Sequence, residues 1–165
     1  MIKLVVVEDE ALVRQGLVLA VDWAALDCVV VGEAANGEEG LEVILRAQPD
    51  FVLTDVRMPR LDGIGMIRQL RAEGCRAEFI ILTAYSDFEY AHSAVRLGVA
   101  DFLLKPFADR ELNAAVGRVR DRLWVACRRR VDGARDGLRR RSGYDPGGVC
   151  VGENRCRGRA CSDAA

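Results

Sequence analysis

The chain has 165 residues, of which 50% are apolar and 30% are charged, and its formal net charge is −1. This length allows one domain with a real core and an appendage, but not two full domains. No apolar stretch approaches the roughly 18–20 residues of a membrane span. The amino terminus begins directly in a strand pattern, without the features of a signal peptide. Composition thus argues against a membrane protein, and we expect a cytoplasmic location.

Five short apolar runs follow one another along residues 1–123, separated by segments with helical spacing. Each run is continuous and rich in branched residues, which is typical of buried parallel strands. In chain order the runs are Leu4–Val7, Val29–Val31, Phe51–Leu53, Phe79–Leu82 and Phe102–Leu104. Five strand–helix repeats predict an α/β fold, with a five-stranded parallel, doubly wound sheet and five helices on its two faces.

Local signals mark the helices between these strands. Ser86 followed by Glu89 is a capping box, which predicts a helix that runs to Leu97 and ends at Gly98. Two sets of apolar residues are each expected to share one helical face. The first set is Leu41, Ile44 and Leu45, and the second is Leu112, Val116, Val119 and Leu123. Asn36-Gly37 and Asp62-Gly63 indicate turns, and Asp109 is expected to cap the last helix.

Residues 124–165 differ in composition from the rest of the chain. They carry 10 basic and 5 acidic side chains, whereas residues 1–123 carry 14 and 20. The last helix is expected to extend to about Arg130. The remaining Arg/Gly/Cys-rich tail has very few large apolar residues, so we predict that it is disordered. The four cysteines of residues 124–165 lack the paired spacing of a zinc site. A truncated or out-of-frame end would also explain this composition.

Polar residues stand where four of the five predicted strands end. Ligands of open parallel sheets bind outside the carboxyl ends of the strands. Asp9 and Asp55 offer carboxylates to Mg²⁺, and Glu8 can hold an outer-shell water. A carboxylate attacks phosphorus when a cation relieves the charge repulsion, and Lys105 supplies a further positive charge. Thr83 offers a hydroxyl to a phosphoryl oxygen. Together the residues at these strand ends are Glu8, Asp9, Asp55, Thr83 and Lys105.

These motifs, as a set, resemble the receiver domain of two-component response regulators over about residues 2–123. They are Val7–Glu10, Thr54–Gly63, Leu82–Ala84 and Phe102–Phe107. The resemblance implies a flavodoxin-like strand order of 2-1-3-4-5 and the transfer of a phosphoryl group to Asp55 from a sensor histidine kinase. It implies that Asp9, Asp55 and the backbone carbonyl of Arg57 bind Mg²⁺, with Glu8 nearby. Lys105, often before a cis bond to Pro106, would bind the phosphoryl group, and Thr83 and Phe102 would form a switch pair.

Two positions depart from the pattern of many receivers. Glu8-Asp9 stands where two aspartates are frequent, and Phe102 stands in place of a tyrosine, which leaves packing as the switch signal. Two other function classes remain open. One is a phosphate-independent interaction module on the same fold. The other is an aspartyl phosphatase-type enzyme, which would need a second acid where Arg57 stands. We expect a non-enzymatic switch that catalyses only its own phosphorylation and dephosphorylation.

The segment Leu82–Ala91 resembles receivers that precede AraC-type DNA-binding domains. Such an output domain would need about a hundred further residues with helix-turn-helix patterns, and no such pattern follows here. The family also makes a homodimer plausible, formed through the last two helices and the last strand. We therefore expect a receiver at 1–123, a tail at 124–165, no membrane partner and a kinase as the phosphoryl donor.

Overall fold

The computed structural model describes residues 1–84 and 96–141, and within this range the side chains of residues 127–141 are not described. The chain divides into two units, Met1–Arg128 and Arg129–Ala165. The sheet and all residues of the candidate site lie in the first unit. In the described part of the chain, no helix is both long and apolar enough to cross a membrane.

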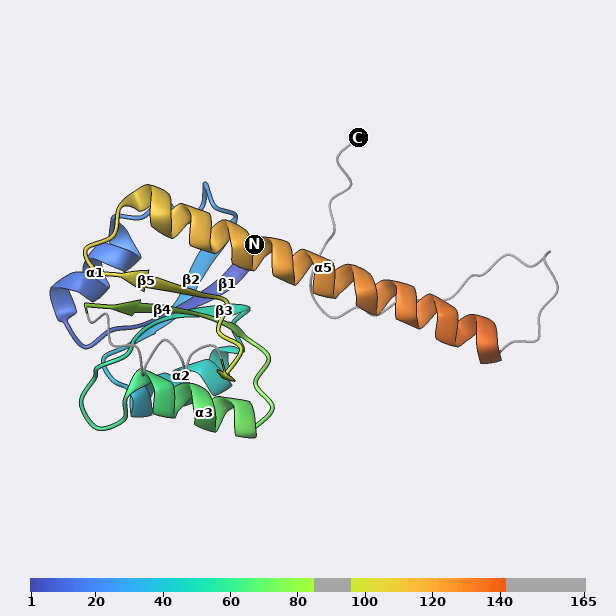
Figure 1. Cartoon of the computed structure of the whole chain (residues 1–165), viewed down its shortest axis with the longest axis horizontal. Helices are drawn as coiled ribbons and strands as arrows, with labels where there is room; N and C mark the ends of the chain where they lie inside the picture. The colour runs from blue at the N-terminus through green and yellow to red at the C-terminus, as the bar shows by residue number, and fades with distance from the viewer. Residues whose placement is uncertain (85–95, 142–165) are drawn as a thin grey trace. The chain divides into compact units, whose positions relative to one another are not determined.

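The five strands predicted from the apolar runs form one parallel sheet (Figure 1). Its order, β2-β1-β3-β4-β5, confirms the doubly wound arrangement. The strands are β1 (Ile2–Val7), β2 (Cys28–Ala34), β3 (Phe51–Asp55), β4 (Glu78–Thr83) and β5 (Asp101–Leu104). Since β3 is central and flanked by β1 and β4, the residue at its carboxyl end lies in the middle of the functional edge.

Four helices are described, and they are α1 (Ala11–Leu19), α2 (Gly37–Ala47), α3 (Gly63–Ala72) and α5 (Asp109–Arg141). The further helix predicted from Ser86 falls largely outside the described residues, as do Tyr85 and His92. Gly98, expected to end that helix, has a φ of +67°, the left-handed conformation that glycine adopts without strain.

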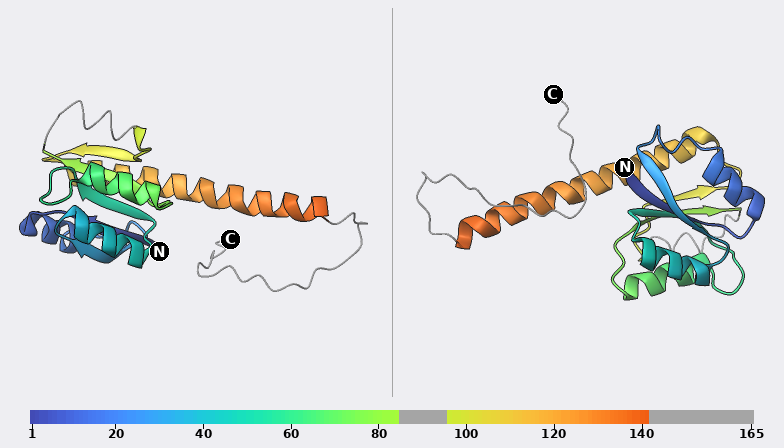
Figure 2. Two further views of the ribbon diagram at one scale, coloured as in Figure 1. Left: turned by 90° about the horizontal axis from the view of Figure 1, so that it is seen from below. Right: turned by 180° about the vertical axis from the view of Figure 1, so that it is seen from behind.

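Two hydrophobic cores cover the two faces of the sheet, because side chains alternate along each strand. Val5 and Val7 of β1 pack in the core shared with α2 and α3. Leu4 and Val6 pack in the opposite core, with α1 and the first part of α5. Figure 2 shows α2 and α3 side by side on one face. Leu112, Val116 and Val119 are buried and Leu123 packs beside them, so the predicted apolar face of the last helix is confirmed.

The Asn36-Gly37 and Asp62-Gly63 pairs, predicted as turns, are the starting points of helices. Asn36 is the N-cap of α2 and accepts a hydrogen bond from the amide of Glu39 at 3.1 Å. Asp62 caps α3 in the same way, through the amide of Gly65. These caps satisfy amides that a helix leaves unpaired at its start. Both helices therefore begin at a fixed point directly after the carboxyl edge of the sheet.

Three further details differ from expectation. Leu45 is 42% exposed, while Ile44 is buried, so Leu45 lies outside the apolar face of α2. Asp109, expected as the cap of the last helix, is instead the first residue of α5. Ala108 precedes the helix, and its amide donates a hydrogen bond to the Glu111 carboxylate. α5 also continues to Arg141, beyond the expected end near Arg130. The added residues, 131–141, include four arginines, one leucine and one alanine, which are residue types that favour helix.

Gly63 adjoins the backbone of the candidate site, and a side chain there would collide with it. A Cβ at this position would lie 2.1 Å from the carbonyl oxygen of Asp55. We expect Gly63→Ala to lower the free energy of unfolding by about 1–3 kcal/mol, the usual cost of overpacking. Gly117→Ala in α5, where nothing lies within 4 Å of the added Cβ, should instead raise it by up to about 1 kcal/mol. Urea unfolding of both variants tests the contrast, and equal effects would contradict it.

Candidate functional site

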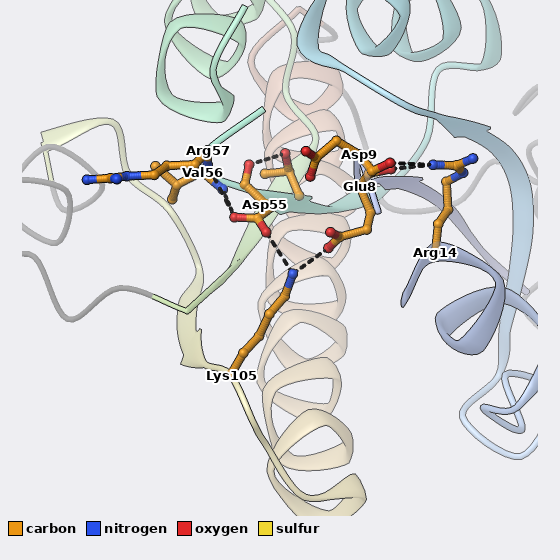
Figure 3. Close-up of polar contacts among 8 residues, drawn as sticks. Glu8, Asp9, Arg14, Asp55, Val56, Arg57 and Lys105 are labelled. Atoms are coloured by element: carbon orange, nitrogen blue, oxygen red, sulfur yellow. Dashed lines mark hydrogen bonds and ion pairs between the residues drawn. The ribbon is translucent and has the colours of Figure 1, made fainter. Parts of the chain in front are cut away.

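Three strands bring acidic and basic residues together at the carboxyl edge of the sheet (Figure 3). Val7 of β1 pairs with Thr54 of β3, so the residues that follow them, Glu8 and Asp55, come level at this edge. Lys105 directly follows β5 and points back toward both acids. Its peptide bond to Pro106 is cis, as the family resemblance implied.

The Lys105 side chain bridges the two buried acids. Its Nζ lies 2.7 Å from Glu8 Oε2 and 2.7 Å from Asp55 Oδ2, and both contacts are ion pairs with hydrogen-bond geometry. Glu8 is fully buried, and Asp55 is nearly so. Charge-assisted hydrogen bonds of this length are among the strong ones in proteins. One cation therefore holds carboxylates from two neighbouring strands in fixed positions.

The backbone after Asp55 orients its carboxylate. Oδ1 accepts hydrogen bonds from the amide of Val56 and, at 3.2 Å, from the amide of Arg57. The Thr54 hydroxyl donates to the carbonyl of Asp55 at 2.9 Å. With Lys105 on Oδ2, both carboxylate oxygens have a donor. Asp55 is thus held in one orientation, which is what a carboxylate needs if it is to act on a group outside the strand end.

Burial and ion pairing have opposing effects on the pKa of Glu8 and on the pKa of Lys105. Burial raises the pKa of Glu8 above its usual value, although the hydrogen bond and the charge of Lys105 oppose the rise. Burial alone would lower the pKa of Lys105, but its hydrogen bonds to Asp55 and Glu8 outweigh this and raise that pKa. Lys105 therefore stays positively charged at neutral pH.

Three carboxylates converge next to Lys105. Glu8, Asp9 and Asp55 each offer an oxygen, and these oxygens all lie within 4.8 Å of one another. Glu8 Oε1 is buried and accepts no hydrogen bond from the described residues, and a buried oxygen without a donor is costly. Hard oxygen donors around an unsatisfied buried atom fit a divalent cation such as Mg²⁺. The predicted metal ligands Asp9, Asp55 and Glu8 therefore lie together, whereas binding by the Arg57 carbonyl stays a prediction.

Thr83 and Phe102, the predicted switch pair, lie on neighbouring strands of the same sheet. Leu82 pairs with Asp55, so Thr83 lies one residue beyond it at the carboxyl edge. Thr83 is buried, and its carbonyl accepts a hydrogen bond from the amide of Lys105 at 2.7 Å. Phe102 pairs with Ile81 and is partly buried against the α2/α3 core. Thr83 thus adjoins the site, while Phe102 lies three residues before Lys105 on β5.

Sequence reasoning missed Arg14 of α1. Its guanidinium donates hydrogen bonds to the backbone carbonyl of Glu8 at 2.5 Å and to that of Asp9 at 3.5 Å (Figure 3). It also lies 3.5 Å from Glu33 at the end of β2. The available signal was weak, because one arginine in the second turn of a helix is ordinary. Only the fold brings this side chain next to the backbone of Glu8 and Asp9.

Comparison with known proteins gives the family. Residues 4–117 match the family described as the response regulator receiver domain, which is more than half of the chain. The chain belongs to this receiver family. Receivers of two-component response regulators act in phosphorelay signal transduction, and this is the class of function that the family assigns to the chain. The predicted fold, strand order and family are thereby confirmed.

Individual relatives agree with this assignment. The receiver is 34% identical over 119 residues to the transcriptional regulatory protein YesN of Bacillus subtilis (strain 168), covering 72% of this chain and 32% of YesN. It is 35% identical over 119 residues to the transcriptional regulatory protein HptR of Staphylococcus aureus (strain N315), covering 72% of this chain and 46% of HptR. The chain therefore spans less than half the length of these curated relatives.

A solved structure supports the same fold. The receiver resembles the REC domain of AraT, a response regulator from Geobacillus stearothermophilus, with a TM-score of 0.70 and 36% sequence identity. The match covers 76% of this chain and 97% of that one. The likeness extends over nearly the whole AraT domain, so the sheet and its carboxyl edge belong to the shared part.

The raised pKa of Glu8 leads to a pH-dependent prediction for the metal-free receiver. A group whose pKa is higher in the folded state favours folding at low pH, and this contribution is lost as the pH rises. Glu8→Gln has no charge to bury, so its stability relative to wild type should increase as the pH rises above about 4.5, the usual pKa of glutamate. Urea unfolding in EDTA from pH 4 to 8 measures this difference.

A matched variant separates this effect from a change in net charge. Glu42→Gln removes one carboxylate from an exposed position on α2. The pH-dependent gain should occur in Glu8→Gln and not in this control. A stability difference for Glu8→Gln that stays flat or falls with pH would contradict the prediction.

Proposed function

We propose that this receiver accepts a phosphoryl group on Asp55 from the phosphohistidine of a sensor histidine kinase, with Mg²⁺ bound beside it. The observation that carries the proposal is the environment of Asp55. Its carboxylate lies between two backbone amides and the Lys105 ammonium, within a cluster of three acids. This combination supplies an oriented nucleophile together with positive charge for the transferred group.

The transfer exchanges one bond to phosphorus for another. An Asp55 carboxylate oxygen forms a bond to phosphorus while the phosphorus–nitrogen bond of phosphohistidine breaks. The imidazole nitrogen keeps the bonding electrons and takes up a proton from solvent. Lys105 adjoins Oδ2 at 2.7 Å, so its ammonium would lie beside the phosphoryl oxygens as transfer proceeds. The amides of Val56 and Arg57 hold the carboxylate during the reaction.

Asp9 and Asp55 would hold Mg²⁺, together with the Arg57 carbonyl, and Glu8 would bind the ion directly or through a water. When bound, the ion supplies charge neutralisation between the carboxylates and the incoming phosphoryl group. The unsatisfied Oε1 of Glu8 supports this placement. Glu8 is also one atom longer than an aspartate, which lets it contact Lys105 from the end of β1.

The response to phosphorylation would involve Thr83 and Phe102. We propose that the Thr83 hydroxyl moves to a phosphoryl oxygen and that Phe102 moves inward, which remodels the surface near β5 and α5. This is a shift between pre-existing conformations. The remodelled surface would serve partner binding, including a homodimer. The names of YesN and HptR make transcriptional regulation the output we propose for the signal.

A phosphate-independent interaction module is the alternative function. A protein of that class needs the receiver fold but not the cluster of charged residues at the carboxyl edge of the sheet. A module without phosphoryl chemistry has no reason to bury two carboxylates, Glu8 and Asp55, around a lysine at a strand edge, since buried charges cost several kcal/mol each unless well paired. The ion pairs of Lys105 with Glu8 and Asp55 therefore favour phosphoryl acceptance over a phosphate-independent interaction module.

Acetyl phosphate with Mg²⁺ should phosphorylate the wild-type receiver at Asp55. Mass spectrometry of the intact chain should find one added phosphoryl group, and reduction with borohydride should mark residue 55 in the peptide map. Asp55→Asn removes the nucleophile and should remain unmodified. Lys105→Met keeps the nucleophile but should slow the reaction by about 10²-fold, because a charge that stabilises the transition state is lost. Failure of the wild type to react, or equal labelling of Asp55→Asn, would refute the phosphoacceptor.

The switch can be tested separately from the chemistry. Beryllofluoride with Mg²⁺ mimics a phosphoryl group on Asp55 without turnover. We expect the backbone chemical shifts of β5 and of the first half of α5 to change on its addition. Thr83→Ala should bind the mimic but show much smaller changes in β5. Unchanged shifts in the wild-type protein with the mimic bound would contradict the switch.

A further inference from the structure

We infer that Arg14 is a positioning residue, which fixes the backbone of Glu8 and Asp9 so that their side chains can bind Mg²⁺. The inference rests on the proposed function, because it assigns a supporting residue to the proposed metal site. Arg14 has no contact with Asp55 or Lys105 among its described bonds. It would therefore act only through the two acids.

Apart from its ion pair with Glu33 of β2, the contacts of Arg14 converge on the β1–α1 junction. Its Nη1 donates to the carbonyl oxygens of Glu8 and Asp9, and its backbone amide donates to Glu10 at 2.9 Å. The side chain is only 17% exposed. One residue thus binds the carbonyls of both acids and begins the hydrogen-bond ladder of α1. These hydrogen bonds fix the orientation of the Glu8 and Asp9 carbonyls, and with them the backbone from which the two acidic side chains extend.

The junction has few other supports. The Glu8 amide donates to Ala34 of β2 at 3.0 Å. Glu10, the N-cap of α1, makes no side-chain capping bond. Asp9 is exposed and lies beyond the last paired residue of β1. Without Arg14, the described bonds would hold the Glu8 backbone through its amide alone and would leave the Asp9 carbonyl without a donor.

Geometry, more than charge, is what Arg14 supplies. Its guanidinium is 3.5 Å from the Glu33 carboxylate, so the pair is close to neutral. The planar guanidinium can serve Glu33 through Nε and the two carbonyls through Nη1 at the same time. A lysine keeps the charge, but its single ammonium cannot reproduce this fork. Substitution of Arg14 by lysine therefore separates the effect of its positive charge from the effect of its hydrogen-bond geometry.

The test is direct Mg²⁺ binding to the full metal-free chain, measured by isothermal titration calorimetry at constant ionic strength. We expect Arg14→Lys and Arg14→Gln each to raise the Kd for Mg²⁺ about tenfold, the low end for residues that support metal ligands. Arg46→Lys, an exposed residue in the last turn of α2, is the matched control and should bind like wild type. Thermal unfolding in EDTA identifies any variant that has lost its fold.

A second measurement separates metal positioning from catalysis. With acetyl phosphate, Arg14→Lys should need more Mg²⁺ for half-maximal phosphorylation but reach the wild-type rate at saturation. Amide chemical shifts of Glu8, Asp9 and Glu10 should differ from wild type even without metal. These readouts remain available if Arg14→Gln is unstable.

Each result decides the inference. A Kd unchanged in both Arg14 variants would overturn it while leaving the proposed function intact. Wild-type binding by Arg14→Lys with weak binding by Arg14→Gln would also overturn it, because charge alone would then suffice. A wild-type receiver that binds no Mg²⁺ would refute the metal site of the proposed function, and the inference with it.

Discussion

The Lys105 ammonium bonds Glu8 and Asp55 at once, and the arrangement of the whole carboxyl edge depends on this bridge. Buried carboxylates cost several kcal/mol each unless they are paired. The fold must therefore bring the ends of β1, β3 and β5 level, with the single cation on the outermost of these strands. The parallel order β2-β1-β3-β4-β5 achieves this by placing the acid-bearing strands next to each other. Register, burial and charge are linked at this edge.

The site also works against the stability of the domain that carries it. Burial raises the pKa of Glu8, so its charged form weakens the folded state, and one of its oxygens lacks a hydrogen bond among the described residues. The two hydrophobic cores compensate, since they cover both faces of the central strands. Functional sites often keep such unfavourable groups because activity requires them. The unfavourable energy of Glu8 is also the energy that a bound cation could recover.

Much of this arrangement could be predicted from the sequence. Phe51–Leu53 followed by Asp55 carries a local signal, since a continuous apolar run indicates a buried strand and a polar residue marks its end. The same reasoning placed Asp9, Thr83 and Lys105 at one edge. Arg14 could not be found in this way, because its partners at the site are the backbone carbonyls of Glu8 and Asp9, and a backbone partner leaves no trace in sequence. The extent of α5 was also underestimated, because arginine-rich composition suggests solvation as readily as helix.

The hydrogen bond from the Lys105 amide to the Thr83 carbonyl joins the ends of β4 and β5. The two side chains expected to contact a phosphoryl group thus stand on backbones that share one bond. A displacement of either strand end is transmitted to the other through a contact only 2.7 Å long. Lys105 and Thr83 therefore form a mechanically coupled pair. Their contributions to a signal should be strongly non-additive, as expected for groups that move as one body.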